Sequence, residues 1–122
     1  MVVEQWIQGK PLCSIEAMKP FKHPAPDDFV LERILHALSD PVRLEIVQRL
    51  AQVAEASCGD LDGGRPKSSV SHHFRVLRDA GLVCTYAAGT THMNSLRHEE
   101  MDRRFPGLLD AVLKNISPTQ ST

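Results

Sequence analysis

The run from Lys67 to Leu96 limits most strongly what this chain can fold into. It opens with apolar residues at positions i, i+4 and i+7, which are Val70, Phe74 and Leu77. That spacing places three side chains on one face of a helix, so the pattern predicts a helix from about Lys67 to Ala80. Gly81 follows directly, and glycine is the usual residue where a helix ends in a left-handed turn.

Two strand-like runs come next, at residues 82–87 and 92–96, and a short connection that contains Gly89 joins them. This pattern is typical of a β-hairpin. With the helical signals on either side, the predicted order is helix, helix, short helix or turn, helix, hairpin, helix. The fold class that this order predicts is mainly α with a β-hairpin, a winged helix-turn-helix.

The first two helices are predicted from their capping residues. One helix is expected after Pro26, where Asp27 or Asp28 can accept hydrogen bonds from free backbone N–H groups. The next is expected at Asp40-Pro41, because an acid at the N-cap followed by proline is a typical helix start. Both helices continue into apolar residues at helical spacing.

The two terminal helical regions carry the longest apolar stripes. Residues 97–115 are predicted to be helical with an interruption near Pro106, whereas residues 54–66 indicate only a short helix and a glycine turn. Because a domain this small has two terminal helices with four apolar positions each, packing between two copies of the chain is favoured over burial within one. The residues predicted to form this dimer interface are Leu31, Ile34, Leu35, Leu109, Val112 and Leu113.

A length of 122 residues corresponds to one domain. Prolines interrupt any helix early in the chain, so residues 1–26 are predicted to be an N-terminal arm, partly flexible. Residues 27–116 are the predicted winged helix-turn-helix domain for DNA binding and dimerisation, and residues 117–122 a loose tail. No apolar run approaches the roughly 20 residues of a membrane span, and no secretory signal pattern is present, so we expect a cytoplasmic protein without a membrane partner.

Charge is unevenly distributed, although the formal net charge is only −1. Residues 63–78 contain four basic side chains and no acidic one, whereas acids outnumber bases in residues 99–110. A helix fits the major groove with its N-terminal residues at the base edges, and a hairpin can lie along the backbone. Double-stranded operator DNA is the predicted partner, and the predicted contact residues are Arg65, Lys67, Ser68, Ser69, Ser71, His72, Arg75, Thr90 and Thr91.

Two runs resemble a known family. The runs LSDPVRLEIVQRL (38–50) and SSVSHHFRVLRDAGLV (68–83), in this order, are similar to the ArsR-type (arsenic-repressor) family of bacterial regulators, and Gly89 fits that family's wing. The resemblance covers about residues 28–116. It implies a winged-helix homodimer paired through its first and last helices, and a repressor that an inducer or stress signal releases from its operator. Whether a small molecule or a redox change is the inducer stays open.

The sequence departs from the family's metal sensors. Those proteins often carry Cys-x-Cys-Asp-Leu before the recognition helix, whereas the matching run here is Ser57-Cys58-Gly59-Asp60-Leu61, so both ligand positions are lost. The Asp/His ligands of the family's last helix are also absent, and residues 87–91 at the wing tip contain no arginine. We therefore expect no metal site and no cofactor, and weaker wing contacts to phosphate.

The three cysteines, Cys13, Cys58 and Cys84, are too few and too widely spaced for a disulfide framework. Reduced thiols are the favoured interpretation. The alternative is a thiol- or metal-responsive repressor that uses Cys58 and Cys84. A zinc site from Cys84, His92 and His98 is a further alternative, but it lacks a recognised spacing.

Other functions are less consistent with the residues. His72 and His73 are adjacent and cannot share a helix face, so we expect His73 to pack beside the apolar stripe and His72 to face DNA. Ser71 beside His72 does not form a nucleophile–base pair, and no hydrolase, phosphate-loop or zinc-protease motif occurs, so we expect no enzyme. A winged-helix protein-interaction module without DNA binding is the alternative, which a basic stripe along the recognition helix would disfavour.

Overall fold

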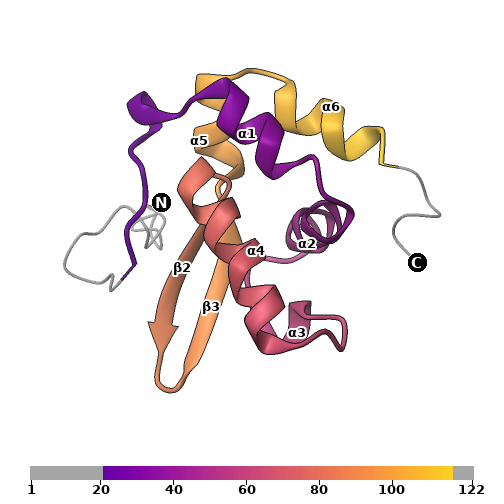
Figure 1. The fold of residues 1–122 in the computed structure, drawn as a ribbon. Coiled ribbons are helices and arrows are strands. Elements are labelled where there is room, and N and C mark those ends of the chain that lie inside the picture. The colour runs from indigo at the N-terminus through magenta and orange to yellow at the C-terminus, as the bar shows by residue number, and fades with distance from the viewer. Residues whose placement is uncertain (1–20, 117–122) are drawn as a thin grey trace.

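The computed structural model describes residues 21–116, and it confirms the predicted order of helices and hairpin (Figure 1). Residues 1–20, with Cys13 and most of the predicted arm, and residues 117–122, the predicted tail, lie outside the described residues. The helices are the 3-10 helix η3 (Pro26–Asp28), α1 (Leu31–Ala37), α2 (Pro41–Leu50), α3 (Cys58–Leu61), α4 (Lys67–Ala80), α5 (His98–Arg104) and α6 (Leu108–Lys114).

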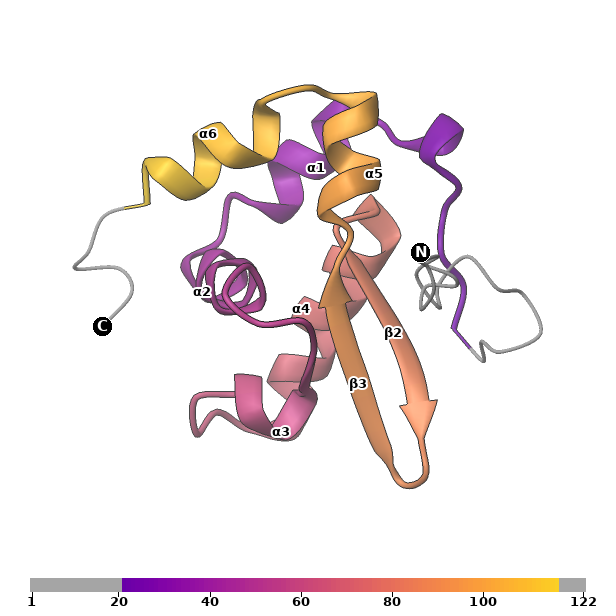
Figure 2. The same ribbon diagram turned by 180° about the vertical axis from the view of Figure 1, so that it is seen from behind.

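The strands form one antiparallel sheet in the order β1-β3-β2, built from β1 (Ala56–Ser57), β2 (Val83–Ala88) and β3 (Thr91–Leu96). The hairpin of β2 and β3 projects away from the helices, and its tip lies at the same end of the molecule as the start of α4 (Figure 1). Helices α1, α5 and α6 lie at the opposite end (Figure 2). Among residues 21–116, no helix is long and apolar enough to cross a membrane.

Helix α4 has the bounds that its apolar stripe predicts. Val70, Phe74 and Leu77 are buried, and α4 packs on α1, α2 and β2. Gly81 ends the helix with φ +92°, and a Cβ at this position would collide with the Phe29 ring. A side chain there would meet both the unfavourable backbone region and this ring, so Gly81 is required for α4 to stop and β2 to begin.

The predicted start of α2 is confirmed, whereas the predicted start of α1 is wrong. Asp40 Oδ2 accepts hydrogen bonds from the backbone N–H groups of Val42 (2.9 Å) and Arg43 (3.1 Å), and Pro41 is the first residue of α2. Asp27 and Asp28 instead lie in η3, and no side chain caps α1. The chain between them is extended because Phe29 buries its ring against Gly81.

Residues 54–66 contain a strand that the sequence did not predict. Ala56 and Ser57 pair with Asn94 and Met93 of β3, and the Ser57 side chain then caps α3 by accepting from the Asp60 N–H (3.1 Å). Two residues are too few to show the alternation that marks a strand. The hairpin is longer than predicted, because Ala88 pairs with Thr91 across a two-residue link.

The predicted dimer stripes divide into core and surface. Ile34 (0 % exposed) and Leu109 (1 %) are buried within the protomer, so they belong to its core and have no surface left for a partner to cover. This corrects their assignment to the interface. By contrast, Leu31 (42 %) and Leu35 (48 %) are exposed. Their assignment, and that of the partly buried Val112 and Leu113, stays a prediction.

The described part of the predicted arm lies along the hairpin. His23 Nε2 accepts a hydrogen bond from the Thr85 backbone N–H (2.9 Å), and the Pro24 carbonyl accepts one from Arg97 Nη1 (2.9 Å). The Phe21 ring makes an edge contact with His92, with ring centroids 4.9 Å apart. From Phe21 onward, the chain therefore packs against the domain.

Candidate nucleic-acid interface

The segment of α4 from Lys67 to Arg75 presents polar and basic side chains to solvent. Its exposed residues include all the predicted contact residues on this helix: Lys67, Ser68, Ser69, Ser71, His72 and Arg75. The first helical hydrogen bond here runs from Val70 N–H to the Pro66 carbonyl (3.1 Å), and no side chain caps the helix. Free N–H groups, hydroxyls and a lysine that forms no ion pair within residues 21–116 are suited to a phosphate.

The hairpin tip lies beside this end of α4. Thr90 and Thr91 are exposed and line the same groove as Lys67 and Ser71, a space of about 460 Å³ between α4 and the hairpin. The structure thus brings the two predicted wing contacts onto one surface with Lys67 and Ser71. That placement is what a winged helix needs to touch the groove and the backbone of one duplex.

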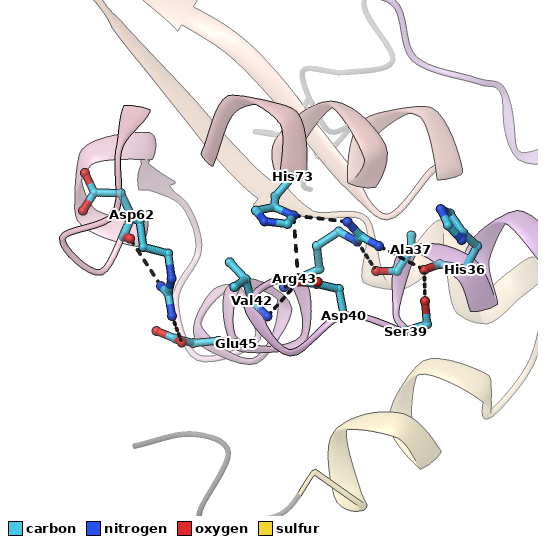
Figure 3. Close-up of polar contacts among 10 residues, drawn as sticks. His36, Ala37, Ser39, Asp40, Val42, Arg43, Glu45, Asp62 and His73 are labelled. Carbon is cyan, nitrogen blue, oxygen red and sulfur yellow. Dashed lines mark hydrogen bonds and ion pairs between the residues drawn. The ribbon is translucent and has the colours of Figure 1, made fainter. Parts of the chain in front are cut away.

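Arg65 is oriented differently from the other predicted contact residues. Its guanidinium donates to Glu45 Oε1 (3.2 Å) and to the Asp62 carbonyl (3.3 Å), which connects the loop before α4 to α2 (Figure 3). Glu45 therefore compensates its charge. Arg65 is the weakest of the predicted DNA contacts, because a phosphate would have to compete with this carboxylate.

His73 connects α4 to α1 and α2, and it is packed as expected. Its Nδ1 lies 3.1 Å from Arg43 Nη1 and 3.8 Å from Asp40 Oδ2. The buried Arg43 donates through Nε to the Ala37 carbonyl (2.7 Å) and through Nη2 to the His36 carbonyl (3.3 Å) (Figure 3). Burial lowers the pKa of His73, although Asp40 opposes this, and the neutral ring can accept from Arg43.

Three cations on α4 have no carboxylate partner in the part of the chain that the structure describes. Lys67, Arg75 and Arg78 form no ion pair there, whereas Arg65 is paired with Glu45. These cations begin at the first residue of α4 and extend to its last turn. Positive charge without a fixed partner along the recognition helix favours a polyanionic ligand over a protein-interaction module.

Sequence reasoning missed several residues of the groove, above all Arg78. The groove is also lined by Phe21, Cys58 and His92. Arg78 follows Phe74 by four residues and Lys67 by eleven, so helical spacing alone would have placed it on the groove side. Phe21 and Cys58 could not have been found in this way, because they reach the groove from distant segments.

The two described cysteines do not form the predicted alternative redox pair. Asn94 Nδ2 donates to Cys58 Sγ (3.2 Å), and Asn94 lies opposite Thr85 in the sheet. Cys84 is the neighbour of Thr85 along β2, so its side chain points to the other face. Cys58 is a free thiol.

The alternative zinc site is not assembled either. His92 pairs with Ala87 near the hairpin tip, whereas Cys84 pairs with Ser95 towards the base and His98 begins α5. Within residues 21–116, no group of three or more metal-ligating side chains comes together.

A basic helix presented beside a β-hairpin defines a winged helix-turn-helix DNA-binding protein. A helix-turn-helix domain model matches residues 38–84. The HTH-type transcriptional regulator YceK of Bacillus subtilis is 36% identical over 89 residues, which cover 70% of this chain and 89% of that protein.

The arsenical resistance operon repressor of Staphylococcus xylosus is 40% identical over 73 residues, covering 59% of this chain and 70% of that protein. A solved ArsR family transcriptional regulator has the same fold, with a TM-score of 0.57 at 24% identity, over 66% of this chain and 90% of that one. The chain belongs to the ArsR-type family of winged helix-turn-helix transcriptional regulators, whose members bind DNA and are not enzymes.

Proposed function

We propose that this chain is a transcriptional repressor that binds a specific operator sequence as a homodimer and leaves it in response to a signal. The observation that carries the proposal is the pair of uncompensated cations on α4. Lys67, on the groove side, and Arg75, on the outward side, have no carboxylate partner within residues 21–116. Lys67 lines the groove beside the exposed hairpin tip. Repression is supported by the name of the S. xylosus relative, an operon repressor.

Each exposed residue of α4 takes a role from its position. Lys67 and the free N–H groups of the first turn bind phosphate and so set the position of the helix on the duplex. Arg75, two turns further, reads a base edge, as arginine does with guanine O6 and N7. Ser71 and His72, which lie between Lys67 and Arg75 on the helix, supply shorter hydrogen bonds to the DNA. Thr90 and Thr91 contact the DNA backbone from the hairpin.

Dimerisation uses the end of the molecule opposite the hairpin tip. Leu31 and Leu35 on α1 are exposed apolar side chains, and Val112 and Leu113 on α6 are partly buried. Both helices lie at that end (Figure 2). A twofold dimer through them presents two α4 helices and predicts an inverted-repeat operator with half-sites about one helical turn, or a multiple of it, apart. The cytoplasm, where bacterial DNA is accessible, is the proposed compartment.

Selection from random duplexes tests DNA recognition directly. The full chain is expected to enrich an inverted repeat, and fluorescence anisotropy then gives its affinity for that sequence. Arg75→Ala should weaken binding by about 1–3 kcal/mol and relax specificity at one position per half-site. The control is Arg103→Ala, which removes an exposed arginine from α5 at the other end. A folded chain that enriches no sequence would contradict the proposal and favour the protein-interaction module.

Sedimentation tests the dimer separately. Leu35→Glu places a charge in the proposed interface, where it would lose water without gaining a partner. The variant should sediment as a folded monomer, because Leu35 is half exposed in the protomer. Ala88→Glu is the control, since Ala88 is an exposed apolar residue at the hairpin tip, at the opposite end of the molecule. A folded wild-type monomer at working concentration would exclude the assembly.

A further inference from the structure

We infer that the groove between α4 and the hairpin tip binds a small organic anion, a carboxylate on an apolar body, and that this ligand competes with DNA. The competition rests on the proposed function, whereas the binding itself does not. The volume of about 460 Å³ is within the range of small-molecule sites.

The groove combines apolar and cationic surfaces. Buried Val70 and Phe74 on α4 form its apolar base, and Phe21 closes one side. Lys67 and Arg78 lie on the same side of α4, eleven residues apart. Asp62 is the acid among the lining residues, and its Oδ1 is already engaged by the Gly64 N–H (2.9 Å). An apolar body with one negative group matches this arrangement.

Arg78 is the group that selects an anion. Its guanidinium carbon lies 4.7 Å from the centroid of the Phe21 ring, and among residues 21–116 it has no carboxylate within ion-pair distance. The side chain is half-buried, and burial lowers its pKa, which records the loss of water around the charge. A charge that has lost part of its hydration gains more from an anionic partner than an exposed one does.

DNA phosphate is a poor candidate for this position. Lys67 begins α4, whereas Arg78 lies eleven residues later, which is about 16 Å along the helix axis. A duplex held by the first turn of α4 and by the hairpin tip, with Arg75 reaching it from outside the groove, would leave the Arg78 end of the groove to a separate ligand.

The same groove explains how such a ligand would act. Besides Arg78, its lining contains Lys67, Ser71, Thr90 and Thr91, all of them proposed DNA contacts. An occupant that pairs with Lys67 or fills the space between Ser71 and the two threonines removes contacts that the operator needs. Binding of the ligand and binding of DNA thus exclude each other.

Cys58 is a built-in reporter of occupancy. It is a free, partly buried thiol in the lining, and Asn94 donates to its sulfur. A ligand in the groove should slow its alkylation by iodoacetamide, a neutral reagent. Cys84 lies buried on the other face of the sheet and should react slowly with or without ligand.

The test uses the full chain and 1-naphthoate, an aromatic carboxylate, in calorimetric titration. Arg78→Met, which keeps the apolar stem, should weaken binding at least tenfold, and Arg78→Lys should retain most of it. The matched control is Arg75→Met, one turn away, exposed and outside the lining. Neutral 1-naphthylmethanol and acetate, which lacks the apolar body, should each bind at least tenfold more weakly than naphthoate.

Two readouts decide the site. Saturating naphthoate should slow alkylation at Cys58 at least fivefold, by peptide mass mapping, and should weaken operator binding at least tenfold. Equal naphthoate affinity in wild type and Arg78→Met, or no protection of Cys58, would overturn the site. Protection without any effect on operator binding would overturn the competition. A chain that binds no operator refutes the proposed function, while the titration and the alkylation still decide the groove.

Discussion

The interior of this protein and the groove side of α4 use basic residues in opposite ways. In the interior, Arg43 donates to two backbone carbonyls, and Arg97 donates through Nε (2.7 Å) and Nη2 (3.1 Å) to the two carboxylate oxygens of Glu100. On α4, Lys67 and Arg78 have no carboxylate partner within residues 21–116. Interior arginines hold segments together, whereas the cations of α4 are available to a ligand.

The two regions meet at one helix. His73 on α4 faces Arg43 and the α1–α2 junction, while its neighbour His72 is exposed. Helical geometry makes this possible, because adjacent residues point about 100° apart. Substitutions on the interior side should therefore change the free energy of unfolding, and those on the outer side should change ligand binding alone.

The largest expected effect is at the buried pair. Glu100→Gln leaves Arg97 as a buried charge without its carboxylate, which typically costs about 3–5 kcal/mol. Urea unfolding at fixed protein concentration measures the loss. Glu99→Gln is the control, because Glu99 is exposed on the same helix and its variant should stay within about 0.5 kcal/mol of wild type. Equal stabilities of the two variants would contradict the structural role of the interior pair.

A somewhat smaller effect is expected at Arg43. Arg43→Met keeps much of the side-chain volume but removes the buried donor of the Ala37 carbonyl, whereas the His36 carbonyl still accepts from Ser39, so unfolding should become easier by about 2–3 kcal/mol. Urea unfolding again provides the measurement, with Arg75→Met as the exposed arginine on the neighbouring helix. The comparison fails if Arg75→Met is the more destabilised of the two.

Lys67→Ala should alter DNA binding and leave stability unchanged. If Lys67 contacts phosphate, the variant should bind all sequences more weakly, and the slope of log affinity against log salt should shrink by about one. Anisotropy titrations at several salt concentrations give this slope. Lys114→Ala, an exposed lysine on α6, is the control that should keep the wild-type slope. An unchanged slope in Lys67→Ala would remove Lys67 from the interface.

The smallest effect concerns pH and His73. Burial lowers its pKa in the folded protein, so below about pH 6.5 the unfolded chain takes up a proton there that the native chain resists. The free energy of unfolding should accordingly fall as the pH drops from 7.5 to 5.5. His73→Gln should reduce this dependence, and the exposed neighbour variant His72→Gln should not. If only His72→Gln reduced the pH dependence of the free energy of unfolding, the titrating group would be His72, and the prediction for His73 would be wrong.

Most helix starts and ends and the order of elements could be predicted from the sequence, because they depend on residues that are close to one another along the chain. Asp40 caps α2 two and three residues away, and the stripe of α4 repeats within single helical turns. Near Asp27 the same reasoning failed, because the Phe29 ring packs against Gly81, some fifty residues further along the chain. Strand β1 was missed for a similar reason, since its partner strand begins at Thr91.

By itself, the sequence determined the winged helix-turn-helix, the family and the exposed residues of α4, all of which rest on local spacing and motifs. Only the tertiary structure decided which charged side chains are paired and which apolar side chains are buried. It pairs Arg65 with Glu45, places Arg78 beside the Phe21 ring without a carboxylate partner from residues 21–116, and buries Ile34 inside the protomer. The physical reason is that burial and charge pairing depend on side chains distant in sequence, and periodicity along one segment carries no information about them.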